Sequence, residues 1–429
     1  MQFQSPTGTL DIYAPESDEI QKLVVVFSKL VKYLGYKLIL TPMFEDAGLF
    51  KAGAGQNADV VTKEMYEFED KSGRHLALKP EGTASVIRAF VQHSYQTPFK
   101  AWYLSPAFRY ENPQSGRYRQ HHQLGVEVLG PTSYLADVEI IYLLDRFYKE
   151  LGLKNYRLLI NSMGHSEVGE ASECRNQYKV VLLKYLDQRA ELLCQDHRLK
   201  YELNPLRVLD CKKPDCVGAL EGAPRLVDYL CQDCMTHHES VLNALSDLNI
   251  EFENAHNLVR GFDYYTKTTF EFQSTALKSS QSAISGGGRY DNLVANLGGQ
   301  DVSGAGFGIG IERLMMALNA EEIRLDKSEQ YDCFLVNLVT DFMPMKLIDS
   351  FIKAGLRIGY SIDGGSLKSQ MRQANKSGAD IGIIIGASEL ESASATLKNL
   401  RNSDQFGVSI DSLVSEASKL LATIREKKF

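Results

Sequence analysis

The chain has 429 residues, of which 44% are hydrophobic and 24% charged, and its formal net charge is −7. This length predicts roughly two to four domains, and the acidic balance excludes a generally basic nucleic-acid coat protein. Any contact with nucleic acid would have to use local basic patches. Seven cysteines, no signal-peptide pattern and no apolar run near the ~20 residues of a membrane span lead us to expect a cytoplasmic protein.

The N-terminal part predicts a helix followed by short strands. Apolar residues recur at helical spacing over residues 20–34, and a strand is expected over 37–41, before Pro42. The Gly- and Ala-rich residues 50–59 favour a loop. Residues 65–68 and 76–78 favour two short strands around a turn.

The residues Pro80-Glu81-Gly82-Thr83 stand before a helix predicted over 84–93. Glu81 and Thr83 could cap this helix. A carboxylate and a hydroxyl at a strand end could equally bind an ammonium group. The sequence leaves both interpretations open.

The stretch 108–130, FRYENPQSGRYRQHHQLGVEVLG, predicts a β-hairpin with a long basic loop. One apolar strand ends at Arg109, and the second carries Glu127 between two valines. A guanidinium at a strand end can bind a phosphate with two hydrogen bonds, and Arg117 and Arg119 could reach over the same site. The alternative is a surface hairpin with solvated charges.

The middle of the chain predicts a helix over 137–151 and a strand over 156–160. Residues 166–245 are rich in Glu, Lys, Gln and Leu at helical spacing and predict a helical insertion.

The insertion carries two cysteine pairs, Cys211-x4-Cys216 and Cys231-x2-Cys234. Two such pairs could build a tetrahedral Zn²⁺ site, although the first spacing is looser than usual, and inert thiols are the alternative. We expect His237 and His238 to be exposed helix residues, not ligands.

The stretch 258–272, LVRGFDYYTKTTFEF, favours a functional site because core strands rarely begin with Arg, Asp and two Tyr. Arg260, Tyr264 and Tyr265 stand at the entrance of a strand predicted over 268–272.

Two glycine-rich stretches follow. In 285–291, SGGGRYD, three glycines could let the backbone approach a ligand closely or could form a tight turn. In 303–314, SGAGFGIGIERL, a crowded strand leads into a helix with Arg313 at the junction. Neither the dinucleotide-binding glycine pattern nor a phosphate-binding P-loop pattern occurs in the chain.

After a charged linker, 324–329, strands alternate with helices over 330–429, which predicts a small α/β domain with parallel strand pairing. Lys368, Arg372 and Lys376 recur on one helix face. This face could be solvated, or it could follow a phosphate backbone.

Together these stretches resemble class II aminoacyl-tRNA synthetases, and most closely the histidyl-tRNA synthetase family, over essentially the whole chain. Motif 1 resembles the helix and strand ending at Pro42, motif 2 resembles FRYENPQSGRYRQ, and motif 3 resembles GFGIGIERL. LVRGFDYYT, SGGGRYD and PEGT single out the histidyl family.

The resemblance implies an α+β catalytic domain with a six-stranded antiparallel sheet, a helical insertion and a C-terminal α/β anticodon-binding domain. The corresponding boundaries are 1–165 and 246–323 for the catalytic domain, 166–245 for the insertion, 324–329 for the linker and 330–429 for the anticodon-binding domain.

The resemblance also implies a homodimer that joins L-histidine to the 3′ end of tRNA(His) through a histidyl-adenylate, using ATP and Mg²⁺. The implied histidine-binding residues are Glu81, Gly82, Thr83, Gln123, Glu127, Arg260, Tyr264, Tyr265, Arg289 and Tyr290. The implied ATP-binding residues are Arg109, Glu111, His121 and Arg313, and the implied catalytic residues are Arg109, Arg260 and Arg313. The expected tRNA contacts are Gln114, Arg117, Arg119, Lys368 and Arg372.

Three positions depart from the family pattern. Asn112 and Lys79 stand where the family usually has Arg, and His121 stands where it usually has the Phe that stacks on adenine. One alternative function is the catalytically inactive, synthetase-like regulatory subunit of ATP phosphoribosyltransferase. A tRNA-sensing domain of a regulatory protein and a class II synthetase of another specificity are further alternatives.

Overall fold

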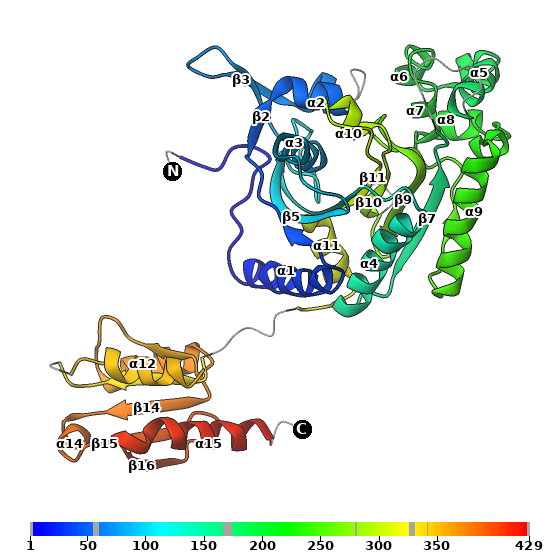
Figure 1. Ribbon diagram of the computed structural model, residues 1–429. Helices are drawn as coiled ribbons and strands as arrows, with labels where there is room; N and C mark the ends of the chain where they lie inside the picture. The colour runs from blue at the N-terminus through cyan, green and yellow to red at the C-terminus, as the bar shows by residue number, and fades with distance from the viewer. Residues whose placement is uncertain are drawn as a thin grey trace. The chain divides into compact units, whose positions relative to one another are not determined.

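The structure, a computed structural model, describes residues 3–54, 60–165, 174–278, 281–325, 331–340 and 342–426. The chain forms two compact units, residues 1–326 and residues 327–429 (Figure 1). Most of the predicted linker, 324–329, lies outside the described residues.

A mixed sheet of eight strands forms the centre of the large unit, in the order β1-β5-β6-β11-β10-β9-β7-β8. The strands are β1 (Lys37–Leu38), β5 (Phe99–Phe108), β6 (Gln120–Leu129), β7 (Tyr156–Ser162), β8 (Glu253–Asn254), β9 (Thr266–Ser274), β10 (Ala283–Arg289) and β11 (Gly304–Gly310). The six inner strands pair antiparallel, whereas β1 and β8 pair in parallel with β5 and β7 at the two edges. The predicted six-stranded antiparallel sheet is therefore wrong in strand number and edge orientation. Of the two edge strands, β1 lies within the strand predicted over 37–41, whereas β8 was not predicted.

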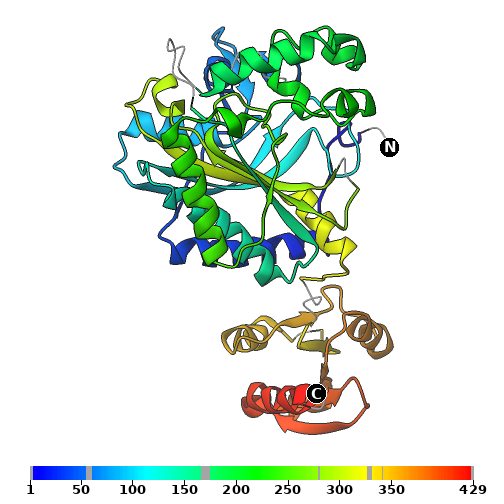
Figure 2. The same cartoon turned by 90° about the vertical axis from the view of Figure 1, so that its right-hand side faces the viewer.

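One face of this sheet is apolar and is covered by helices. Phe27 of α1 (Glu16–Tyr33) packs edge-on against Phe147 of α4 (Leu135–Leu151) and Phe307 of β11, with ring centroids 5.1 and 6.3 Å apart. Residues of α11 (Ile311–Ala320) and α9 (Gln232–Asp247) belong to the same core. Figure 2 shows these helices along the sheet. The predicted helices over 20–34 and 137–151 are confirmed.

The large unit also contains a small three-stranded sheet and three short helices near it. The strand order of the small sheet is β2-β4-β3, with β2 at Phe44–Asp46, β4 at His75–Leu78 and β3 at Tyr66–Glu69. The helices are α2 (Ala47–Ala54), α3 (Thr83–His93) and α10 (Leu293–Asn296), and a π-helical turn covers Val60–Glu64. The predicted strands over 65–68 and 76–78 are confirmed. The predicted loop over 50–59 is wrong for 50–54, which belong to α2, and 55–59 lie outside the described residues.

The described residues of the insertion form helices joined by turns, in line with the predicted helical insertion, and 166–173 lie outside the described residues. Only α5 and α9 are long. The elements are α5 (Cys174–Asp187), a 3-10 turn over Ala190–Leu192, α6 (Gln195–Arg198), α7 (Leu206–Leu209), α8 (Pro214–Ala219), a 3-10 turn over Leu226–Tyr229, and α9.

The small unit has its own sheet, in the order β13-β12-β14-β15-β16. Its elements are β12 (Cys333–Asn337), α12 (Met345–Lys353), β13 (Ile358–Tyr360), α13 (Leu367–Lys376), β14 (Ile381–Ile385), α14 (Ala387–Glu391), β15 (Ser394–Asn399), β16 (Gln405–Ser409), a 3-10 turn over Ile410–Ser412, and α15 (Leu413–Glu426). The predicted parallel pairing is confirmed for β12 with β13 and β14. The antiparallel hairpin of β15 and β16 was not predicted.

Candidate functional site

The second face of the eight-stranded sheet is polar, and the alternation of side chains along each strand produces this difference. In β6, Leu124, Val126 and Val128 enter the helix-covered core. His121, Gln123 and Glu127 occupy the alternate positions of the same strand, so they share the opposite face. The polar face therefore carries the side chains for which the sequence predicted functions.

A pocket of about 240 Å³ lies on this polar face. Three predicted arginines line it, Arg109, Arg260 and Arg313, although they are far apart in the sequence. The remaining lining residues are Glu111, Gly116, Arg117, Tyr118, His121, Glu271, Ala283, Ile284, Ser285, Gly286, Gly308, Gly310 and Glu312. The pocket therefore brings together all the predicted ATP-binding residues.

Backbone carbonyls accept hydrogen bonds from some of the guanidinium N–H groups of Arg109 and Arg313. Arg109 donates through Nε to the Pro80 carbonyl at 3.0 Å. Arg313 donates to the Gly116 carbonyl at 3.0 Å and the Ala283 carbonyl at 3.1 Å. Such anchoring orients a cation while further N–H groups can face a bound anion.

Arg260 is paired with a carboxylate that the sequence did not single out. Its Nη1 donates to Glu271 Oε2 at 2.7 Å, and its buried Nε has no hydrogen-bond partner among the described residues. Gly286 lies beneath this guanidinium, and a Cβ there would collide with it. The glycine run 286–288 lies within β10, so it does not form the tight turn that the sequence left open.

Two pocket carboxylates, Glu271 and Glu312, escaped the sequence analysis. Glu312 accepts hydrogen bonds from the backbone N–H of His122 at 2.9 Å and pairs with its Nδ1 at 2.8 Å. The third carboxylate of the pocket, Glu111, which was predicted, pairs with Arg117 at 2.8 Å. The signals were present, because Glu271 interrupts an apolar strand and Glu312 adjoins Arg313.

His121 lies in the pocket as a neutral ring. Burial, together with the positive charges of Arg109 and Arg313, lowers the pKa of His121 to about 3. The neutral imidazole ring can therefore stack on an aromatic ring without adding a charge to the site.

Beyond the pocket, the polar face leads to a buried carboxylate, Glu127. Its side chain is fully buried and accepts hydrogen bonds from the hydroxyl groups of Tyr103, at 3.3 Å, and Tyr290. Burial raises the pKa of Glu127 to about 8. Gly306 faces this carboxylate, and a Cβ there would collide with it. Tyr103 was not predicted, because a Tyr in an apolar strand resembles a core residue.

Three further predicted aromatic residues, Tyr264, Tyr265 and Tyr290, are buried in the same region. The ring of Tyr264 lies 4.7 Å from that of Tyr265 and 5.8 Å from that of Tyr290. Together with Glu127 they form a compact group of polar tips, which suits recognition of a small polar ring.

The Pro-Glu-Gly-Thr segment shows the capping arrangement. Glu81 accepts hydrogen bonds from the backbone N–H of Thr83 at 2.8 Å and of Ala84 at 2.9 Å, at the start of α3. Burial raises the pKa of Glu81. Gln123 accepts a hydrogen bond from the backbone N–H of Gly82 at 3.1 Å, which ties this segment to β6.

Arg289 differs from its predicted place in the histidine pocket. It is fully buried, and Asp137 accepts from its Nε with both oxygens at 3.1 Å. Its terminal nitrogens donate to Ser303, Asp291 and the carbonyls of Pro131 and Ser133. The structure thus gives Arg289 a structural role between β10 and α4.

The predicted tRNA contacts lie at the surface or in the hairpin loop. Gln114 and Arg117 are exposed, and Arg119 stacks on the ring of Tyr110 at 4.1 Å. Lys368 and Arg372 are exposed on α13 of the small unit. Of the remaining departures from the family pattern, Asn112 is exposed and contributes no charge. Lys79 is buried and donates to Thr41 Oγ1 at 3.1 Å.

The prediction of one metal site from Cys211, Cys216, Cys231 and Cys234 is wrong. Cys231 and Cys234 lie with His165 and Cys174, whereas Cys211 and Cys216 lie with Cys194 and His197. The expected exposure of the two helix histidines is also wrong. His237 Nε2 lies 2.7 Å from Asp137 Oδ2, and His238 is buried. Proximity along the chain did not show which side chains meet.

No helix among the described residues is both long and apolar enough to cross a membrane.

Comparison with known proteins is consistent with this geometry. A family model described as histidyl-tRNA synthetase matches residues 8–314, and one described as an anticodon binding domain matches residues 332–420. The histidine–tRNA ligase of Halothermothrix orenii is 41% identical over 426 residues, covering 98% of this chain and 100% of that one. That of Clostridioides difficile is 39% identical over 427 residues, covering 98% and 100%.

Among solved structures, apo histidyl-tRNA synthetase of S. aureus superposes with a TM-score of 0.79 at 32% identity, covering 97% of this chain and 99% of that one. A protein from Bacillus halodurans, described as an ATP phosphoribosyltransferase regulatory subunit/histidyl-tRNA synthetase, has a TM-score of 0.64 at 20% identity, covering 90% and 100%. That second likeness shows the fold alone. The catalytic match, the full-length relatives and the pocket agree: this chain belongs to the histidyl-tRNA synthetase family.

Proposed function

We propose that this chain activates L-histidine with ATP and transfers it to the 3′ end of tRNA(His). The observation that carries the proposal is the meeting of Arg109, Arg260 and Arg313 in one pocket on the polar face of the sheet. Gly308 connects this pocket to the buried group formed by Glu127 and its tyrosines. It lines the pocket and lies against Gln123, and Gln123 shares a face of β6 with Glu127. An anion site beside a site for a small polar ring suits ATP and histidine.

In the first step, a carboxylate oxygen of histidine attacks the α-phosphorus of ATP, and the bond to pyrophosphate breaks. Negative charge grows on the phosphate oxygens in the transition state. Fixed cations in a partly buried pocket stabilise that charge without reorganising, and this effect is usually the largest in such catalysis. Arg260 and Arg109 would act at the α-phosphate, and Arg313 at the adenine and the γ-phosphate.

Mg²⁺ fits the same pocket, because Mg²⁺ prefers carboxylate oxygens and phosphates, and Glu111, Glu271 and Glu312 line it. When bound, it would neutralise phosphate charge. His121, held neutral, offers its ring face to adenine.

In the second step, the terminal ribose hydroxyl of the tRNA attacks the carbonyl carbon of the adenylate, and AMP leaves. We propose that Gln114, Arg117 and Arg119 of the hairpin loop contact the acceptor end. Lys368 and Arg372, both exposed on α13, would contact the anticodon arm through its phosphates. The reaction implies a cytoplasmic protein, because its tRNA substrate is there.

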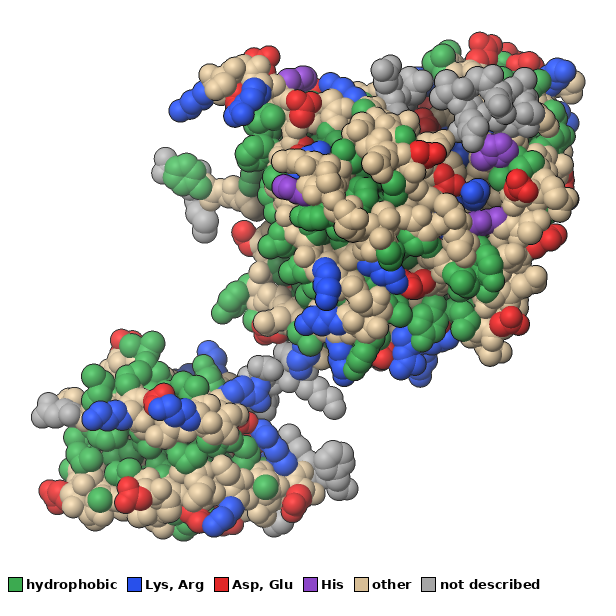
Figure 3. Space-filling model, viewed as in Figure 1, with side chains coloured by type: hydrophobic (Ala, Val, Ile, Leu, Met, Phe, Trp, Pro, Cys, Tyr) green, Lys and Arg blue, Asp and Glu red, His purple; other side chains and the backbone are tan. Residues whose placement is uncertain are grey.

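We further propose a homodimer formed by the motif 1 region. Several large apolar side chains there are exposed in the single chain, among them Leu40 at 78% and Phe44 at 52%. Figure 3 shows apolar side chains at the surface on the side where β2 lies. Burying such a surface is favourable, and light scattering should give a mass near twice that of the chain.

The alternative, a catalytically inactive regulatory subunit, would not need the arginine pocket. Here all three arginines are present and converge. The deciding experiment is ATP–pyrophosphate exchange with Mg²⁺ and each amino acid separately. Exchange with histidine alone is expected. Exchange with another amino acid would overturn the assignment of the pocket, and exchange with none would favour the regulatory subunit.

Removing the small unit separates the two steps. The hydrophobic core of the small unit is formed by its own residues, so the core of the large unit does not depend on it. A chain ending near residue 330 is therefore expected to fold and to retain histidine-dependent exchange within about threefold. Charging of tRNA should fall by at least ~10²-fold, because one of two linked binding modules is lost.

A matched test in the full chain is the double substitution Lys368→Glu/Arg372→Glu, with Lys419→Glu on α15 as its control. Charging that survives both the truncation and the double substitution would refute the role of the small unit in tRNA binding.

A further inference from the structure

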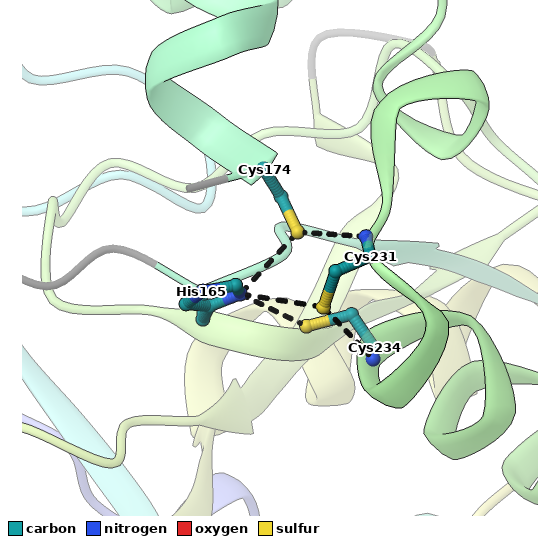
Figure 4. A group of neighbouring side chains, drawn as sticks. All are labelled: His165, Cys174, Cys231 and Cys234. Atoms are coloured by element: carbon teal, nitrogen blue, oxygen red, sulfur yellow. Dashed lines mark hydrogen bonds between the residues drawn. The ribbon is translucent and has the colours of Figure 1, made fainter. Parts of the chain in front are cut away.

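Two clusters of cysteine and histidine, one within the insertion and one that also includes His165 just before it, take no part in the proposed reaction. The first contains His165, Cys174, Cys231 and Cys234, whose side chains point toward one another in Figure 4. The second contains Cys194, His197, Cys211 and Cys216. Within each cluster all four ligand atoms, one nitrogen and three sulfurs, lie within 4.8 Å of one another.

In the first cluster one ring nitrogen meets three sulfurs. The distances from His165 Nδ1 to the Sγ atoms of Cys174, Cys234 and Cys231 are 3.3, 3.3 and 3.8 Å. Hydrogen bonding does not explain this convergence, because a single ring nitrogen offers one N–H or one lone pair. A tetrahedral Zn²⁺ ion with ordinary Zn–S and Zn–N bonds requires N···S separations of about 3.5 Å, which this arrangement matches.

The second cluster repeats the pattern at another place in the insertion. His197 Nδ1 lies 3.4 Å from Cys194 Sγ and 3.6 Å from Cys216 Sγ. Cys211, which follows α7, supplies the third sulfur. Both clusters thus offer three thiols and one imidazole, a soft ligand set that selects Zn²⁺.

Backbone groups already support the sulfurs. The N–H of Cys231 donates to Cys174 Sγ at 3.0 Å, and the N–H of Cys234 donates to Cys231 Sγ at 3.5 Å. In the second cluster the N–H of Cys194 donates to Cys216 Sγ at 3.3 Å. Hydrogen bonds of this kind stabilise thiolate ligands and orient them toward a metal.

The position of each cluster suggests what it stabilises. The first joins His165, just before the insertion, and Cys174, at the start of α5, to the start of α9 in the last part of the insertion. The second joins α6 to the segment from the end of α7 into α8. These helices have four to six residues. Helices this short are not stable alone, and small units with little core often need a metal.

We propose that each of the two clusters binds one structural Zn²⁺ ion through three cysteines and one histidine. The first ion closes the base of the insertion, and the second holds its short helices together. This inference is independent of the proposed reaction, since none of the cysteine and histidine side chains of the two clusters lines the arginine pocket.

The test is metal analysis of the full-length protein, purified without chelators. We expect about two zinc ions per chain. Replacing zinc with Co²⁺ should give the intense visible bands of tetrahedral cobalt and sulfur-to-metal charge-transfer bands in the near ultraviolet. Cys234→Ser and Cys216→Ser should each remove about one equivalent of zinc. The control is Cys333→Ala, which removes the one cysteine outside both clusters and should leave the zinc content unchanged.

The wild-type measurements keep the proposal testable where a cysteine variant does not fold. Fewer than about 0.2 zinc ions per chain, or iron in place of zinc, would overturn it. A tetrahedral cobalt spectrum without sulfur charge transfer would also overturn it. One zinc ion per chain would refute one of the two sites. The serine variant whose zinc content equals that of the wild type would show which cluster binds no zinc.

Discussion

Arg260→Ala is expected to lower the rate of histidyl-adenylate formation by at least ~10²-fold, the effect of losing one preorganised contact with a charged transition state. The guanidinium lines the pocket, pairs with Glu271 at 2.7 Å and has an Nε without a partner among the described residues. Pyrophosphate exchange and single-turnover adenylate formation would measure the loss.

The fold of this variant should be retained, because Glu271 keeps a hydrogen bond from Gln273 at 2.7 Å. The matched control is Arg146→Ala, which removes an exposed arginine that pairs with Glu150 on α4. Turnover near that of the wild type in Arg260→Ala, with thermal unfolding unchanged, would remove Arg260 from the mechanism.

Glu127→Gln is expected to reduce histidine activation by roughly 10⁴-fold while leaving ATP binding nearly intact. A site built to pair buried polar groups with a substrate penalises any mismatch strongly. The carboxyl group is fully buried and accepts hydrogen bonds from two tyrosine hydroxyls, whereas an amide has a single acceptor oxygen and cannot become the anion that would pair with an imidazole N–H. Binding titrations with histidine and with ATP would separate the two effects.

The same substitution should change how stability depends on pH. Because burial raises the pKa of Glu127 to about 8, the folded protein holds a proton that the unfolded chain has already released above about pH 4.5. Stability from this group is therefore present at low pH and is lost as pH rises from about 4.5 to about 8.

Glu127→Gln cannot titrate at this position, so its stability relative to the wild type should increase from pH 5 to pH 8, on the order of 3–5 kcal/mol. Urea unfolding of both proteins at the two pH values measures this difference. The exposed Glu251→Gln serves as the control. A constant difference between pH 5 and pH 8 would mean that Glu127 is ionised in the folded protein.

Particular elements show where sequence reasoning worked. The hairpin of β5 and β6 was predicted because alternating apolar residues surround a polar loop, and its register puts Glu127 on the polar face. The helices α1, α4 and α11 were predicted because a 3.6-residue period marks a face that packs on the sheet. Arg109 and Arg313 drew attention because they stand at a strand end and at the start of a helix, and the structure places both beside one pocket with Arg260. The roles of these arginines come from the family resemblance and stay predictions.

Other features left little local signal. β8 is two residues long and was not predicted, and of the strand predicted over 37–41 only Lys37–Leu38 pairs, as β1, so the pairing of both edge strands depends on the neighbouring strand. Tyr103 resembles a core residue until β6 places it against Glu127. Arg289 resembles a ligand-binding cation until α4 supplies Asp137 as its partner.

By itself, the sequence determined the periodic elements and the two regions that match the catalytic and the anticodon-binding family models. Only the tertiary structure decided which residues meet. It split the four predicted cysteines between two clusters and completed each with a histidine and a further cysteine. The physical reason is that periodicity is a property of neighbouring residues, whereas ion pairs and metal ligation depend on distances of a few ångströms between side chains far apart along the chain.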